Sequence, residues 1–102
     1  MLYRQGDVML RRVDALPGDF TAKGITKTNL MVAEGEVTGH SHVLEGEVLE
    51  FMDELERRFV ELSAETPLTH QEHSTIAVPA GLYEIVRQRE YQPEVGEVRV
   101  LD

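Results

Sequence analysis

The chain has 102 residues, the size of one domain, and 41% of them are hydrophobic, which is enough for one modest core. Its formal net charge of −9 would repel nucleic acid and anionic membrane surfaces, and its lack of cysteine excludes disulfides and thiolate metal sites. Charged residues interrupt the N-terminus, and no apolar run approaches the ~20 residues of a membrane span. We therefore expect a single cytoplasmic domain over residues 1–102 that has neither nucleic acid nor membrane as a partner.

Short apolar runs bounded by Gly and Pro recur along the chain. The clearest are residues 7–13, 30–37, 75–78, 82–91 and 96–101. In the longest run, residues 82–91, alternation places Tyr83, Ile85 and Arg87 on one face of a strand. This pattern predicts an all-β fold, a small sandwich, roll or barrel of roughly five to eight short strands.

Residues 47–62 fit two different structures. Their apolar residues recur at helical spacing and would form the stripe of an amphipathic helix: Val48, Phe51, Met52, Leu55, Phe59 and Leu62. The alternative is a pair of strands, Val48–Met52 and Arg58–Ser63, joined by a charged segment. That segment has no Gly, Pro or Asn, which are the residues that favour a tight turn. Residue pattern alone leaves both structures open.

The four histidines lie in two pairs, His40 with His42 and His70 with His73. On an extended chain His40 and His42 point the same way, whereas a spacing of three converges on a tight loop. Neutral imidazole is a good ligand for transition metals, so the two pairs predict one site for Zn, Ni or Fe. If the metal is catalytic, three protein ligands leave a position for water, and Glu72 is the candidate general base.

A non-catalytic interaction module is the competing hypothesis. Residues 34–61 hold nine acidic side chains against Arg57 and Arg58, so an acidic face can dock a partner while the histidines form structural hydrogen bonds. Arg87 and Arg89 share a strand face, and they can either clamp a carboxylate or phosphate or pair with the acidic stretch. Whether the protein is an enzyme stays open.

Four segments carry a resemblance that covers most of the chain. They are Arg4–Val8, Ala33–His42, Leu68–His73 and Val86–Tyr91. These segments resemble a group of small uncharacterised bacterial and phage proteins, and the resemblance implies no activity. Members of that group tend to have a Gly-containing hairpin turn at the position of residues 53–56. The resemblance therefore favours two strands over one helix for residues 47–62.

A weaker resemblance is to the cupins. Their first motif has two histidines at i and i+2 followed by a glutamate, which is similar to His40, His42 and Glu45. Their second motif contains Pro-x-Gly, which is similar to residues 79–81. Three features depart from the cupin pattern: the gap from histidine to glutamate is short, His70 and His73 precede Pro-x-Gly instead of following it, and 102 residues is small for a full cupin.

Unpaired sheet edges lead us to expect a homodimer. A small all-β domain exposes such edges, and either residues 82–91 or residues 98–100 can pair across a two-fold axis.

Overall fold

A computed structural model describes residues 1–34 and 40–87, which form one antiparallel sheet of eight strands. The strands are β1 (Leu2–Gln5), β2 (Val8–Val13), β3 (Ile25–Glu34), β4 (Ser41–Met52), β5 (Arg58–Leu62), β6 (Thr66–Thr69), β7 (Ile76–Val78) and β8 (Gly81–Arg87). The predicted all-β class is confirmed. No helix in the described ranges is long and apolar enough to cross a membrane.

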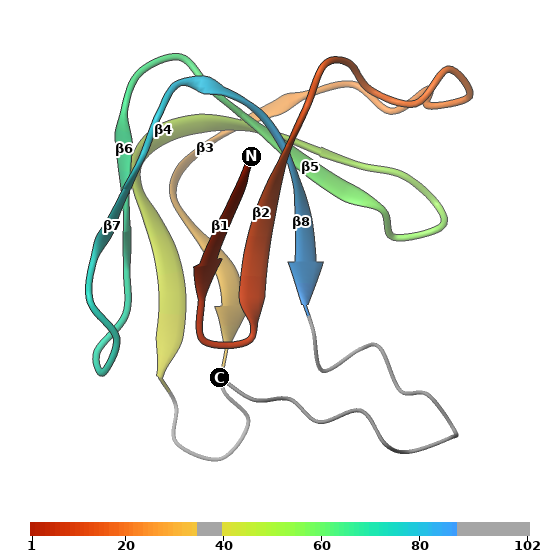
Figure 1. Cartoon of the computed structure of the whole chain (residues 1–102). Helices are drawn as coiled ribbons and strands as arrows, with labels where there is room; N and C mark the ends of the chain where they lie inside the picture. Colours follow the sequence, from red (N-terminus) through yellow and green to blue (C-terminus); the bar gives the residue numbers. More distant parts are fainter. Residues whose placement is uncertain (35–39, 88–102) are drawn as a thin grey trace, which may run out of the picture.

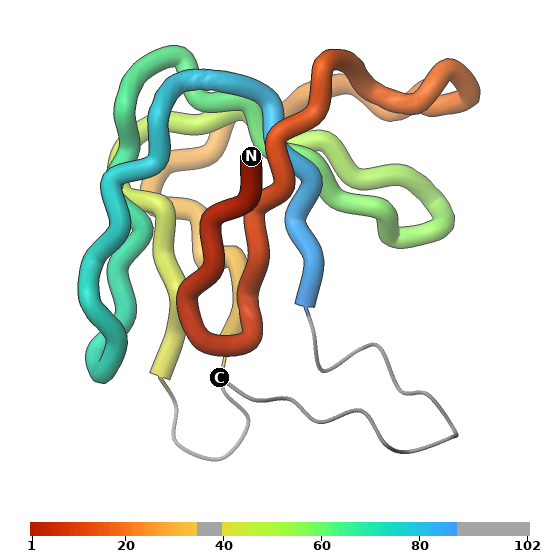
Figure 2. The backbone as a smooth tube through the Cα atoms, in the orientation of Figure 1, coloured from red at the N-terminus to blue at the C-terminus, as the bar shows by residue number. Residues whose placement is uncertain are grey.

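The sheet curls into a small, nearly closed barrel (Figures 1 and 2). Its strands follow the order β1-β2-β8-β5-β4-β6-β7, and β3 pairs with β4 beside this path. The two end strands, β1 and β7, contact each other and bring the sheet close to closure. Several connections and strand ends meet at the lower end of the barrel in Figure 1: the β1–β2 turn, the start of β4, the β6–β7 loop and the end of β8.

The long strand β4 makes this curl possible, because it belongs to both halves of the barrel. It pairs with β6 through Val43 and Leu44 and with β5 through residues 49–52. Between these two regions Gly46 has a φ of 109°, which favours glycine. Its N–H donates to the side-chain oxygen of Asn29 at 2.8 Å, and Asn29 itself has a φ of 55° beside a register shift in β3. Such irregularities bend a strand and increase its twist.

Alternate residues of the strands fill the interior. Eight aliphatic side chains and one aromatic side chain are almost fully excluded from solvent: Val8, Leu10, Val32, Leu44, Val60, Leu62, Leu68, Val78 and Tyr83. Tyr83 satisfies its hydroxyl by donating to the Pro79 carbonyl at 2.8 Å, and its ring packs edge-to-face on Tyr3. The core is therefore mainly aliphatic, as a chain without Trp requires.

Residues 47–62 form two strands, as the first resemblance favoured, and the helix alternative is wrong. Asp53 stabilises the turn although the segment has no Gly, Pro or Asn. Its carboxylate accepts hydrogen bonds from the backbone N–H groups of Leu55 and Arg57 at 3.0 and 2.9 Å. Glu56 completes the turn with a φ of 63°. Pairing between strands outweighs the helical spacing of the apolar residues, because β5 forms backbone hydrogen bonds with β4 on one side and with β8 on the other.

Other expectations from the sequence need correction. Strand β1 was not predicted, and β3 begins at Ile25 instead of residue 30. Pro67 lies inside β6, where it needs no backbone N–H for the pairing with β4, because that pairing involves only Leu68 and Thr69. Strand β8 lies between β2 and β5, so residues 82–87 have no free edge for a dimer. The proposed dimer segment 98–100 and the strand expected at 96–101 lie outside the described residues, as do residues 35–39 and 88–91.

Matched leucine truncations test the assignment of the core. Leu44→Ala removes a side chain with 0% exposure at the centre of the barrel, whereas Leu55→Ala truncates one with 72% exposure. We expect Leu44→Ala to lower the free energy of unfolding by about 2–5 kcal/mol and Leu55→Ala to lower it by less than about 0.5 kcal/mol, as measured by urea unfolding. Equal losses in the two variants would contradict this core.

Candidate functional site

The lower end of the barrel collects polar side chains from segments that are distant in sequence (Figure 1). His42 lies two residues before Leu44 on β4, so both side chains point inward, and His42 is only 4% exposed. His70 and His73 belong to the loop that joins β6 to β7, outside any regular strand. This local geometry agrees with the expectation that a spacing of three converges only in a loop.

The four histidine rings are neighbours in space. The His42 and His70 ring centres are 4.3 Å apart, and the His70 and His73 ring centres are 4.6 Å apart. His40 lies 5.5 Å from His70, and His42 lies 5.9 Å from His73. The structure thus brings both sequence pairs into one group, which we call the histidine cluster.

A buried amide determines the tautomer of His42. Gln5 is 3% exposed, and its Nε2 donates to the carbonyls of Leu68 and Ser74, each at 2.8 Å. Both amide hydrogens are then used, so the atom that faces His42 Nδ1 at 2.9 Å is the acceptor Oε1. His42 must therefore donate from Nδ1, and its Nε2 carries a lone pair when the ring is neutral.

Asp7 faces that lone pair. Its Oδ1 is 3.5 Å from His42 Nε2, and its Oδ2 is 3.3 Å from Nη2 of Arg87. The carboxylate thus lies between an imidazole nitrogen and a guanidinium group. No hydrogen lies between Asp7 Oδ1 and a neutral His42 Nε2, so two electron-rich atoms face each other across this gap.

The pKa of His42 is lowered to about 4, so the ring is neutral at physiological pH. The largest cause is burial, which disfavours the charged form; the positive fields of His70, His73 and Arg87 add to it, while Asp7 opposes it. Burial and the neighbouring His73 and His40 also lower the pKa of His70. Neutral imidazoles are the form that binds metal ions.

His70 and His40 are held differently from His42. The backbone N–H of Glu72 donates to His70 Nδ1 at 3.0 Å, which places the ring proton of neutral His70 on Nε2. The carboxylate of Glu72 lies 3.6 Å from Nδ1 of His40 and is well exposed. Glu72, the predicted general base, therefore lies at the rim of the histidine cluster beside His40.

The glycine of the β1–β2 turn permits the close packing of His73. Gly6 has a φ of 61°, and a Cβ atom at this position would lie 2.8 Å from Nε2 of His73 and 3.4 Å from Cε1 of His42. Any larger residue would therefore strain the turn and displace the imidazoles.

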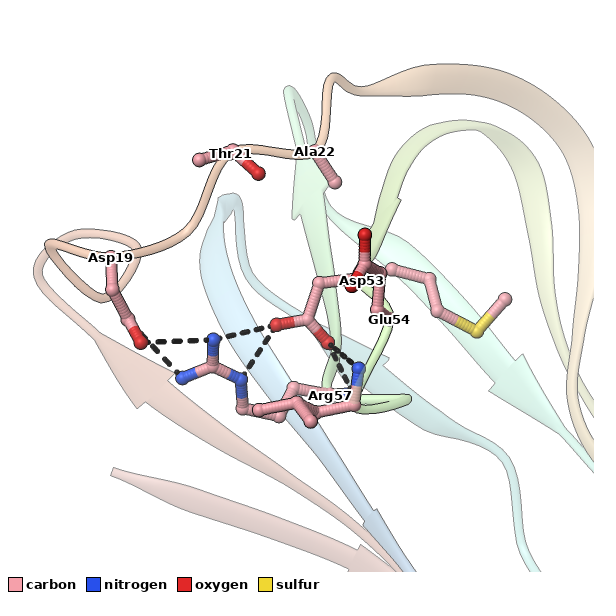
Figure 3. A pocket seen from close by; sticks show the side chains of 8 residues that line it. Asp19, Thr21, Ala22, Asp53, Glu54 and Arg57 are labelled. Carbon is pink, nitrogen blue, oxygen red and sulfur yellow. Dashed lines mark hydrogen bonds and ion pairs between the residues drawn. The ribbon is translucent and has the colours of Figure 1, made fainter.

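The donor atoms are not yet gathered around one point. Within residues 1–34 and 40–87, no group of three or more His, Asp or Glu side chains has the geometry of a metal site. A hollow of about 560 Å³ lies elsewhere, beside the β4–β5 turn. Three of its charged side chains pair with one another, because Arg57 contacts both Asp53 and Asp19 (Figure 3). The facing acceptor atoms of His42 and Asp7 therefore make the histidine cluster the stronger candidate site.

Sequence reasoning identified the histidines but missed Gln5 and Asp7. Both lie in Arg4–Val8, one of the segments that carried the first resemblance, and Gly6 between them marks a turn. The glycine indicated a constrained turn, but nothing in the sequence indicated that Gln5 and Asp7 contact His42. Arg87 pairs with Asp7 and donates a hydrogen bond to the Glu34 carbonyl at 3.5 Å, whereas one of the two alternatives from the sequence was pairing with acidic side chains of residues 34–61.

Comparison with known proteins gives one match. The family described as a domain of unknown function, DUF8820, matches residues 4–88. No curated protein and no solved structure matches the chain significantly. The matched range contains all four histidines, Gln5, Asp7 and Arg87.

The buried neutral His42 predicts a pH-dependent stability of the metal-free protein. Its folded pKa of about 4 lies below the ordinary value of 6.5, so the unfolded chain binds more protons between these values. The stabilisation is complete above about pH 6.5 and is lost as the pH falls towards 4. We expect wild type to lose about 2 kcal/mol more than His42→Gln between pH 7.5 and 4.5, measured by urea unfolding with EDTA present. Parallel pH profiles for the two proteins would contradict a buried neutral His42.

Proposed function

The chain belongs to the DUF8820 family, and from its own residues we propose that it binds a divalent transition metal ion in the histidine cluster. Zn²⁺ is the first candidate, because imidazole nitrogen and carboxylate oxygen are its usual ligands when cysteine is absent. Ni²⁺ and Fe²⁺ accept the same donors. The observation that carries the proposal is the pair of facing acceptors on His42 and Asp7.

The separation of these acceptors suits a shared metal ion. Two ligand atoms at about 2.1 Å from a tetrahedral ion are roughly 3.4 Å apart, and His42 Nε2 lies 3.5 Å from Asp7 Oδ1. The hydrogen bond from His42 Nδ1 to Gln5 is the kind of outer contact that orients a metal-bound histidine. A cation between the two atoms would replace their repulsion with two favourable bonds.

His73 and His70 are the proposed additional ligands. Rings bound to one tetrahedral ion have centres roughly 5 Å apart, and the ring-centre distances between neighbours in the cluster run from 4.3 to 5.9 Å. Binding requires the rings to turn so that their nitrogens converge. His70 must also give up the hydrogen bond that its Nδ1 accepts from Glu72, or rotate to present its other nitrogen.

His40 and Glu72 complete the proposal at the rim. His40 can serve as a fourth imidazole or hold the Glu72 carboxylate, which lies 3.6 Å away. If three protein ligands leave a position for water, Glu72 is the nearby carboxylate that can accept its proton. This gives Glu72 the role of general base in a hydrolytic or lyase reaction.

An interaction module is the competing function. Strand β3 supports it, because β3 pairs only with β4 within the described sheet and exposes Ile25 and Met31. Such a strand can accept a partner strand along its free edge. This function needs no metal, so metal analysis of protein purified without a histidine tag separates the two hypotheses.

Metal-dependent stability tests the proposed site. An ion that binds only the folded chain stabilises it by about 2.7 kcal/mol at a hundredfold excess over Kd. At pH 7.5 we expect Zn²⁺ to raise Tm by roughly 10 °C in a thermal melt, and the increment should shrink towards pH 5 as protons compete for imidazole. His42→Ala and His73→Ala should each remove most of the increment.

The carboxylate ligand is tested by two matched aspartate variants. Asp7→Asn should weaken Zn²⁺ binding at least tenfold in a calorimetric titration, because an amide oxygen carries no charge. Asp19→Asn changes an aspartate that pairs with Arg57 far from the histidines and should leave the affinity unchanged. Wild type without any Zn²⁺-dependent shift would disprove the metal site and favour the interaction module.

A further inference from the structure

Arg87 is placed beside the proposed metal site but is only partly used by the protein. It lies at the end of β8, on the inward face that also carries Tyr83 and Ile85. Its Nη2 contacts Asp7 at 3.3 Å and the Glu34 carbonyl at 3.5 Å. Its Nε is buried, yet it has no hydrogen-bond partner within the described residues. A buried guanidinium donor without an acceptor is costly, and it is a common mark of a site for an anion.

We propose that, when three protein ligands leave one position on the ion open, the metal-loaded site binds a small monocarboxylate, with one carboxylate oxygen in that position and the other accepting a hydrogen bond from Arg87. This inference rests on the proposed metal-binding function. It names the class of ligand or substrate that the site would take.

The size of Asp7 shows that a carboxylate can span the required gap. Its two oxygens already lie between His42 Nε2, at 3.5 Å, and Arg87 Nη2, at 3.3 Å. With a metal ion next to His42, Asp7 would join that ion to Arg87. A ligand carboxylate has the same distance between its oxygens, so it can bridge the same ion and the guanidinium alongside Asp7.

The charges of the site favour a ligand with one negative charge. A divalent ion and Arg87 supply three positive charges, while Asp7 and the rim carboxylate of Glu72 supply two negative charges. The histidine ligands are neutral when they bind metal. One positive charge is left beside the buried His42, and a carboxylate neutralises it. A phosphate dianion would overcompensate that charge in a protein whose net charge is already −9.

Substitution with Co²⁺ allows ligand binding to be measured by absorption spectroscopy. Co²⁺ replaces Zn²⁺ in tetrahedral sites, and its absorption spectrum changes when a ligand binds to it. The full chain loaded with Co²⁺ is titrated at pH 7.5 with acetate, and in separate arms with inorganic phosphate and chloride. We expect a saturable spectral change with acetate in wild type and at least a tenfold higher acetate Kd in Arg87→Gln. Co²⁺ affinity, measured in the same way, should change much less than acetate affinity.

Two further variants control the experiment. Arg11→Gln removes an exposed arginine of β2 that pairs with Glu84, and it should bind acetate as wild type does. Arg87→Lys keeps the charge but loses the Nε donor, so it should also bind acetate more weakly, and it preserves the test if Arg87→Gln does not fold.

Several results would overturn the inference. Equal acetate affinity in wild type and both Arg87 variants would show that the metal alone holds the anion. A response to phosphate that is stronger than the acetate response and depends on Arg87 would replace the carboxylate with a phosphate ligand. No acetate response in a protein that binds Co²⁺ would disprove the carboxylate site and leave metal binding intact. Failure to bind Co²⁺ at all would instead disprove the proposed function, and this inference with it.

Discussion

The buried amide of Gln5 is the contact on which the lower end of the barrel depends. It donates to the carbonyls of Leu68 and Ser74 and accepts a hydrogen bond from His42, so one side chain joins β1 to β4, to β6 and to the β6–β7 loop. A buried amide without these partners would lose its hydrogen bonds to water without replacement. The need to satisfy it therefore determines how these segments meet and which nitrogen of His42 carries the proton.

The short turn after Gln5 brings two more residues, Gly6 and Asp7, next to the histidine cluster. Gly6 adopts a positive φ and leaves room for the His73 ring, and Asp7 comes next, with its carboxylate between His42 and Arg87. Three consecutive residues thus provide an orienting hydrogen bond, a close approach and a candidate ligand. The proposed metal site and the proposed carboxylate site share Asp7, because its two oxygens face different partners.

Burial and charge act in the same direction at this site. Burial in the barrel, together with the neighbouring histidines and Arg87 and against the opposing effect of Asp7, lowers the pKa of His42 to about 4, so the ring keeps its lone pair at physiological pH. A divalent ion is attracted by Asp7 and Glu72 and by the acidic character of the chain as a whole. The C-terminal end of β3 adjoins this site, because Ala33 pairs with His42 and the Glu34 carbonyl accepts a hydrogen bond from Arg87.

Local patterns in the sequence were sufficient for the fold class, for most strands of the described part and for the histidines as candidate ligands. Alternation and turn residues act over a few neighbours, which is why β2, β7 and β8 could be predicted from them. They left residues 47–62 open between a helix and two strands, because the helical spacing of the apolar residues is a local signal, and pairing with β3 and β8 decides for strands. Only the tertiary structure decided that His42 is buried, that Gln5 determines its tautomer and that Asp7 and Arg87 adjoin it. Those contacts depend on the register and closure of the sheet, which join residues that are far apart in the chain and leave no periodic trace in the sequence.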